Sequence, residues 1–142
     1  MKRPSKLLYQ TNKLAYTAMM FHIIAVTIYL IIVLLNMTIN WRIAVVSLSN
    51  VVLMLFAFLV AVKIKVYDAK YQFIPLFLAA YQLYQGLFLP QGVVGNAQII
   101  GLTSAFMAAG FAIMASLVSI HRNKIRKHVI KTFNITNNQL SK

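Results

Sequence analysis

LAYTAMMFHIIAVTIYLIIVLL, residues 14–35, runs through more than six helical turns without a single charged side chain. A helix needs about 20 mainly apolar residues to cross a hydrocarbon core of about 30 Å. The apolar core of a signal peptide has only about 7–15 residues, so this run is too long to be one. The stretch therefore predicts a membrane-spanning helix and an integral membrane protein.

Three further apolar runs follow the first one. The four predicted spans cover about residues 14–35, 43–62, 71–89 and 97–120. The composition agrees with this prediction, because 61% of the 142 residues are hydrophobic and 11% are charged. In a soluble domain about 45–50% of the residues are apolar and about 25% are charged. Backbone polar groups in lipid must be satisfied within their own segment, and short connections make consecutive helices antiparallel. The sequence thus predicts an all-α integral membrane protein, a four-transmembrane-helix antiparallel bundle.

The distribution of basic residues predicts the orientation of this bundle. The chain has 14 Lys and Arg residues and one acidic residue, Asp68. All the cations except Arg42 lie before the first span, between the second and third spans, or after the fourth. Cytoplasmic loops carry the excess of Lys and Arg, so we expect an N-in/C-in protein of a plasma membrane. It has a basic cytoplasmic segment (1–13), a transmembrane domain (14–120) and a basic cytoplasmic tail (121–142), and its composition favours a bacterial source.

Polar side chains recur at one depth, about 7–12 Å below the predicted outer boundary. This candidate polar layer comprises Tyr29, Ser47, Asn50, Tyr81, Gln82, Gln85, Thr103 and Ser104. An unpaired amide in hydrocarbon costs several kcal/mol, so these groups should face one another or water. The preferred interpretation is hydrogen bonding between helices, because four helices leave little central space. The alternative is an outward-open pocket for a small uncharged polar solute.

His22 is an intramembrane ionisable residue and hence a candidate functional residue. A proton relay also needs a carboxylate or a second histidine, and no predicted span contains an acid. A neutral His22 that is hydrogen-bonded to a neighbouring helix is the preferred interpretation.

The fourth predicted span carries a face of small residues. This small-residue face comprises Gly101, Ala105, Ala108, Ala109, Ala112, Ser116 and Ser119. Small side chains at four-residue spacing let helix backbones approach closely. The pattern predicts a packing face, either inside the bundle or against another subunit.

The tail after the fourth span is amphipathic, with Ile125, Val129 and Phe133 recurring every four residues. The cations predicted to bind anionic lipid headgroups are Arg122, Lys124, Arg126, Lys127 and Lys131. The alternative is a docking helix for a partner protein. The third class of function considered is a membrane-surface regulator that acts through this tail.

The sequence contains none of the patterns that support catalysis. Cysteine is absent, which excludes thiol chemistry and thiolate metal sites. No phosphate-binding glycine loop, metal-ligand cluster or nucleophile–base pair is found, and Asp68 is expected to cap the third helix or pair with a lysine. We therefore expect no enzyme activity, no metal and no cofactor. The chain resembles the four-helix small multidrug transporters in outline only, because their mechanism needs a carboxylate in the first span, where this chain has His22.

Two functions follow as hypotheses from this pattern. The first is a non-catalytic small membrane subunit that packs against a larger membrane complex, such as a transport complex. The second is a homo-oligomeric transporter or channel for a small uncharged polar solute. The expected partners are a bilayer with an anionic inner leaflet and a hetero- or homo-oligomeric membrane partner. Nucleic acid is not expected, because the cations flank the apolar spans.

Overall fold

The computed structural model describes residues 11–36, 41–87 and 93–133 of the chain. Within this part 91% of the residues are helical and none is in a strand, so the all-α prediction is confirmed. The elements are α1 (Lys13–Asn36), α2 (Trp41–Lys65), the 3₁₀ turn η2 (Ala69–Tyr71), α3 (Ile74–Leu87) and α4 (Asn96–Phe133). Residues 1–10, 37–40, 88–92 and 134–142 lie outside the described residues, and they include the last two residues of the predicted third span.

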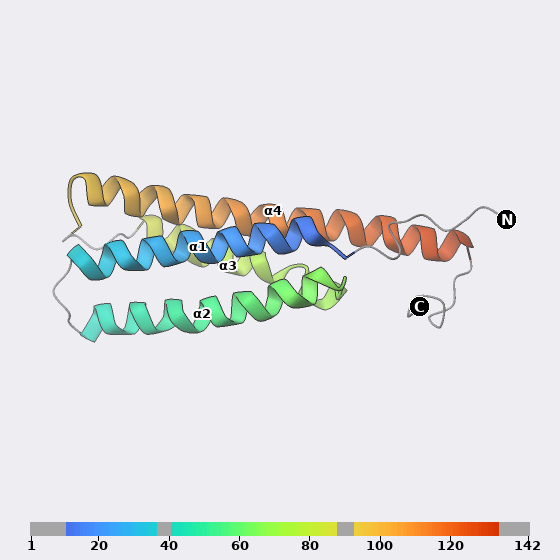
Figure 1. The fold of residues 1–142 in the computed structure, drawn as a ribbon, viewed down its shortest axis with the longest axis horizontal. Helices are drawn as coiled ribbons and strands as arrows, with labels where there is room; N and C mark the ends of the chain where they lie inside the picture. Colours follow the sequence, from blue (N-terminus) through green and yellow to red (C-terminus); the bar gives the residue numbers. More distant parts are fainter. Residues whose placement is uncertain (1–10, 37–40, 88–92, 134–142) are drawn as a thin grey trace.

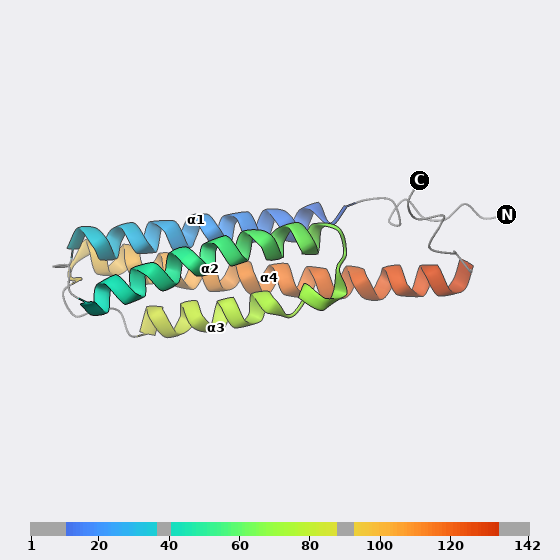
Figure 2. The same cartoon turned by 90° about the horizontal axis from the view of Figure 1, so that it is seen from below.

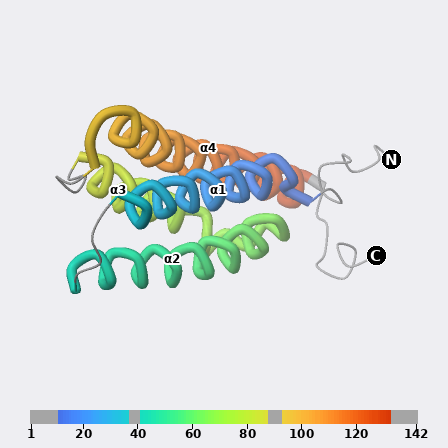
Figure 3. The backbone as a smooth tube through the Cα atoms, turned by 60° about the vertical axis from the view of Figure 1, so that its left-hand side comes forward, coloured from blue at the N-terminus to red at the C-terminus, as the bar shows by residue number. Residues whose placement is uncertain are grey.

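The four helices lie side by side, and each runs opposite to the helix before it (Figure 1). The start of α1, the end of α2 and the start of α3 lie at one end of the bundle, and α4 passes them and continues beyond (Figures 1 and 2). α1 lies between α4 and α2, and α3 packs mainly on α4 (Figure 3). α2 packs mainly on α1 and meets α3 through few residues, so it is the most peripheral of the four helices.

Three of the four helices are long and apolar enough to cross a membrane, namely α1, α2 and α4. The described part of α3 is shorter, with 14 residues, which span about 21 Å against about 30 Å for a hydrocarbon core. The expectation of four full spans is therefore supported for three helices, and α3 begins three residues later than the predicted Tyr71.

The turn between α2 and α3 explains the late start of α3. The backbone N–H groups of Tyr67 and Asp68 donate to the carbonyls of Ile64 and Lys63 at 3.0 and 3.1 Å, which closes α2 in a Schellman motif. Tyr67 occupies the left-handed position of this motif with a φ of 62°, a place where glycine is usual. Asp68 then caps η2 by accepting from the backbone N–H of Lys70 at 3.2 Å. The capping role expected of Asp68 therefore serves this short turn rather than α3 itself.

α4 is longer than the predicted span of residues 97–120, because it continues as one helix to Phe133. Residues 111–133 contain neither glycine nor proline, so nothing in this stretch breaks the helix where its hydropathy falls. Its 38 residues correspond to about 57 Å, and the final turns extend past the rest of the bundle (Figure 1).

Candidate functional site

The polar layer is centred on a hydrogen bond between α2 and α3. The side-chain Nε2 of Gln82 donates to Oδ1 of Asn50 at 3.2 Å. The Nδ2 of Asn50 in turn donates to the carbonyl of Val46 on its own helix at 2.9 Å. Asn50 and Gln82 are 0% and 2% exposed, so this bond lies in the interior and joins two helices that otherwise make few contacts.

Tyr81 makes a second connection between the same helices. Its hydroxyl lies 2.7 Å from Oγ of Ser49, which also donates to the carbonyl of Val46 at 2.8 Å. Ser49 is a member of the site that the sequence analysis missed. The depth argument that selected Ser47 and Asn50 applies equally to Ser49, since it lies between them. Ser47 itself has a buried Oγ without a partner among the described residues.

α1 joins the polar layer through Tyr29. The hydroxyl of Tyr29 donates to the backbone carbonyl of Gln85 on α3 at 3.4 Å, and both residues are buried. The amide oxygens Oε1 of Gln82 and Gln85 are buried without a hydrogen-bond donor in the described part of the chain. The layer therefore has spare acceptor capacity that a water molecule or a small hydrogen-bond donor could fill.

The two polar-layer residues predicted on α4 make no hydrogen bond to the other helices among the described residues. Ser104 is buried and donates to the carbonyl of Gly101 on its own helix at 2.9 Å. Thr103 is exposed, because adjacent residues of a helix point about 100° apart. Side-chain hydrogen bonds of the layer thus link α1, α2 and α3, whereas the prediction had placed a member on each of the four helices.

His22 connects α1 to α4 below the polar layer. Its Nδ1 lies 2.9 Å from the carbonyl oxygen of Ala108, and the residue is 2% exposed. A carbonyl only accepts hydrogen bonds, so Nδ1 carries the hydrogen. The arrangement is a hydrogen bond to a neighbouring helix, and no second ionisable side chain is bonded to His22 in the described chain.

The small-residue face of α4 is turned into the bundle. All seven of its members are buried. Ala105 packs with Tyr29 of α1, Ala108 packs with Ala25, and Ala112 packs with Ala79 of α3. Of the two locations considered for this face, the structure has the internal one. Gly110 lies on the exposed side of α4.

α3 approaches α4 closely at Gly86. A Cβ atom on Gly86 would lie 3.2 Å from Cβ of Ala105, which is tighter than an ordinary van der Waals contact. Glycine at this position therefore lets the two helices meet next to the polar layer.

The end of the bundle where α2 ends and α3 begins carries Lys63, Lys65 and Lys70, and we call it the basic end. Polar contacts around Gln72, in the turn before α3, hold this end together. The backbone carbonyl of Gln72 accepts from Oγ of Ser116 at 2.6 Å. Its side-chain oxygen accepts from Nδ2 of Asn123 at 2.9 Å. These bonds hold the start of α3 against α4.

Three cations at this end rest on tyrosine rings. Arg126 lies 4.9 Å from the ring centre of Tyr67, and Lys65 lies 4.7 Å from that of Tyr16. Lys63 lies 6.0 Å from the ring centre of Tyr71. Of the five predicted headgroup ligands on α4, Lys124, Lys127 and Lys131 are exposed, whereas Arg122 and Arg126 are half-buried.

The fold and the polar layer define a bundle of apolar helices that is compatible with a multi-pass membrane protein. No group of three or more His, Cys, Asp or Glu side chains comes together in the described residues. No family model, no curated protein and no solved structure matches this chain.

Proposed function

We propose that this protein is a non-catalytic small membrane subunit that packs against a larger membrane complex, such as a permease. In this proposal the chain crosses a plasma membrane four times, with both termini in the cytoplasm. The third crossing is α3 together with neighbouring residues. The end of the bundle that gathers the lysines and arginines faces the cytoplasm, as the bias of Lys and Arg towards that side predicts.

The observation that carries the proposal is the outer surface of α2. Val45, Leu48, Val52, Leu55 and Leu59 are 56–66% exposed and follow one another at alternating intervals of three and four residues. This spacing is that of a helix seam that packs into a neighbouring helix. Only 22% of the residues in the most hydrophobic stretch of α2 are buried, whereas 44% are buried in the corresponding stretches of α1 and α4.

The burial of the small-residue face changes where the partner is expected to bind. That face is occupied by α1 and α3, so a partner helix needs another surface. The seam on α2 is peripheral in the bundle and continuous over about four helical turns. We therefore assign the partner contact to α2 rather than to α4.

The test is gentle extraction through a tag on the C-terminus, followed by mass spectrometry of the intact eluate. The expected result is a larger membrane protein that co-elutes at fixed stoichiometry. The double variant Leu48→Ala/Leu55→Ala should reduce the amount of co-eluting partner about tenfold, because it removes two large side chains from the contact. Leu117→Ala is the matched control, since Leu117 of α4 is 59% exposed and lies outside the seam. Equal losses in the two variants would contradict the assignment to α2.

A second candidate function is transport of a small uncharged polar solute by a homo-oligomer. The unpaired amide oxygens of Gln82 and Gln85 favour it, because they offer acceptors to a solute that carries hydroxyl or amide donors. His22 would lie below these groups as an inner gate. In this case the protein elutes alone as a defined oligomer, and Gln82→Leu abolishes solute flux in proteoliposomes while assembly is retained. For a subunit, Gln82→Leu has a mild effect.

A further inference from the structure

The cations at the basic end of the bundle have no carboxylate partner in the described chain. The one acidic residue of the whole sequence is Asp68, and its Oδ1 accepts from the backbone N–H of Lys70. No Lys or Arg side chain within residues 11–36, 41–87 and 93–133 forms an ion pair with another residue of these ranges. Within the described residues, no carboxylate neutralises the positive charge at this end.

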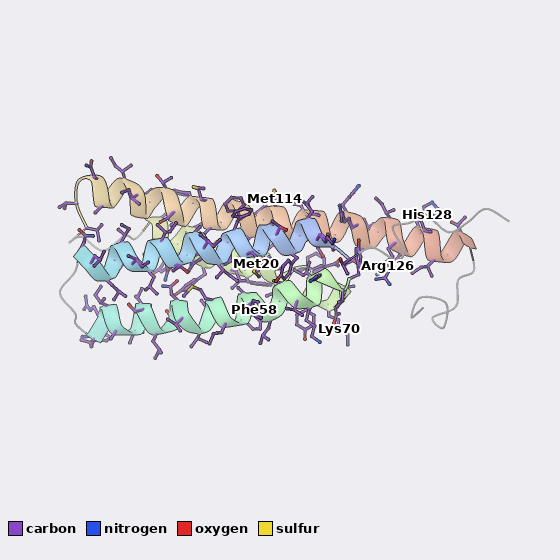
Figure 4. The ribbon with its side chains drawn as sticks, viewed as in Figure 1. Met20, Phe58, Lys70, Met114, Arg126 and His128 are labelled. Atoms are coloured by element: carbon purple, nitrogen blue, oxygen red, sulfur yellow. The ribbon has the colours of Figure 1, made fainter. Side chains whose placement is uncertain are left out.

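Two of these cations are held in place where α1 begins, α2 ends and α4 passes by. The backbone N–H of Asn12 donates to the carbonyl of Lys65 at 2.9 Å, which joins the start of α1 to the end of α2. Lys65 rests on Tyr16, and Arg126 rests on Tyr67. We call Tyr16, Lys65, Tyr67 and Arg126 the basic corner. Figure 4 shows Arg126 on the side of α4 that faces the turn carrying Lys70, and His128 on the opposite side.

Each of the unpaired buried atoms at this corner can donate a hydrogen bond. They are Nε of Arg126, the hydroxyl of Tyr67 and Nδ2 of the neighbouring Asn12, and none has a partner among the described residues. In the polar layer, by contrast, the unpaired atoms of Gln82 and Gln85 are amide oxygens, which only accept. A ligand that is anionic and rich in acceptor oxygens would complement the cations and the donors of this corner. A phosphate group meets both requirements.

We propose that the basic corner binds the phosphate of an anionic phospholipid. A guanidinium offers its donors in a planar fork that matches phosphate oxygens. The contact with the ring of Tyr67 helps to position this fork, and tyrosine rings are typical of the headgroup level of a bilayer. Arg126 and Tyr67 are each half-buried, so part of each side chain lies at the surface, where a headgroup can approach, although Nε of Arg126 and the hydroxyl of Tyr67 are buried. The inference rests on the proposed membrane insertion but not on the partner contact of α2.

This site differs from a diffuse attraction of the tail to anionic lipid. A diffuse attraction depends on the number of charges near the surface, and each exposed lysine contributes about equally to it. A site at the basic corner depends on Arg126 and its fork. Lys127 is the matched control, because it is adjacent in sequence and fully charged but exposed and without a described ring contact.

The experiment measures the binding of the first lipid to the purified full-length protein by native mass spectrometry. Dioleoyl phosphatidylglycerol and dioleoyl phosphatidylcholine are titrated separately in mild detergent. We expect the wild type to prefer phosphatidylglycerol about tenfold or more, which is the contribution of one charge-assisted hydrogen bond. Arg126→Gln should lose about tenfold in affinity for phosphatidylglycerol, and Lys127→Gln should change it little. Arg126→Lys keeps the positive charge but removes the planar fork of donors. Its affinity for phosphatidylglycerol should fall several-fold.

Four results would overturn the proposal. Equal losses in Arg126→Gln and Lys127→Gln would show a diffuse attraction, as would an unchanged affinity in Arg126→Lys. Equal binding of the two lipids by the wild type would show that no anion site exists. Displacement of phosphatidylglycerol by millimolar inorganic phosphate would show that the corner takes a soluble phosphate rather than a lipid. Retention of phosphatidylglycerol under the same phosphate would support the lipid.

Discussion

Asn50 and Gln82 form a buried amide pair that joins α2 to α3, with Nε2 of Gln82 donating to Oδ1 of Asn50 at 3.2 Å. The two helices otherwise make few contacts, so this pair and the neighbouring contact of Ser49 with Tyr81 determine how α2 sits beside α3. Both polar atoms of the Asn50 amide are bonded, because Nδ2 of Asn50 donates to the carbonyl of Val46, whereas Oε1 of Gln82 is unpaired among the described residues.

The amide pair predicts a non-additive response to substitution. Asn50→Leu removes the acceptor of Gln82 and leaves a whole buried amide without a partner, so we expect a loss of about 1–3 kcal/mol in the free energy of unfolding. Asn50→Leu/Gln82→Leu removes the amide of Gln82 as well. Its loss in the free energy of unfolding should therefore be smaller than the sum of the two single losses by about 0.6–2 kcal/mol. Reversible unfolding in mixed detergent micelles measures both quantities. Thr103→Leu is the control, because its hydroxyl is exposed, and strictly additive effects would contradict the pair.

Two glycines predict opposite responses to alanine. Alanine is favoured over glycine in a helix by about 1 kcal/mol, and a Cβ on Gly110 would meet nothing within 4 Å. Gly110→Ala should therefore raise the free energy of unfolding. Gly86→Ala brings its Cβ to 3.2 Å from that of Ala105, and overpacking of this kind costs about 1–3 kcal/mol. We expect Gly86→Ala to be less stable than Gly110→Ala by about that amount, with Ala105→Gly restoring the stability of Gly86→Ala.

The internal position of the small-residue face predicts that bulky residues there unfold the isolated protein. Ala108 is 0% exposed and its carbonyl bonds His22, so Ala108→Leu has no space for its side chain. We expect a loss of about 1–3 kcal/mol, measured on the detergent-solubilised protein without any partner. Met107→Leu, one residue earlier, should be neutral because Met107 is 51% exposed. A stable Ala108→Leu protein that failed only in assembly would place the face at a subunit contact instead.

The backbone of Tyr67 predicts that glycine is better tolerated there than alanine. The φ of Tyr67 is 62°, and at this value a residue with a Cβ is less stable than glycine by roughly 1 kcal/mol. Tyr67→Ala loses the contact with Arg126 and keeps this backbone cost, whereas Tyr67→Gly loses the contact and relieves the cost. Tyr67→Gly should thus be more stable than Tyr67→Ala by about 1 kcal/mol in the same unfolding measurement. The reverse order would mean that α2 does not end in the left-handed turn.

The helices themselves could be predicted closely from the sequence. α1 begins and ends within one residue of the predicted span, because its apolar run is bounded on both sides by Lys13 and Asn36. The end of α4 could not be predicted from hydropathy, since polar residues begin at His121 while the backbone remains helical to Phe133. The start of α3 was also missed, because the Schellman turn at Tyr67 depends on backbone hydrogen bonds rather than on composition.

The polar site could be predicted in part. Depth along each span placed Asn50 and Gln82 at the same level, and they bond to each other. Depth does not specify how a helix is rotated, and for this reason Thr103 was included although it is exposed, while Ser49 was left out although it contacts Tyr81.

By itself the sequence determined the helical segments and the gathering of the lysines and arginines between and beyond them, because hydropathy and charge are properties of consecutive residues. The tertiary structure alone decided which side of each helix is buried. It placed the small residues of α4 against α1 and α3, left the seam of α2 uncovered within the described chain, and laid Arg126 over Tyr67. These relationships depend on the rotation and pairing of helices, which are determined by contacts between residues far apart in the chain.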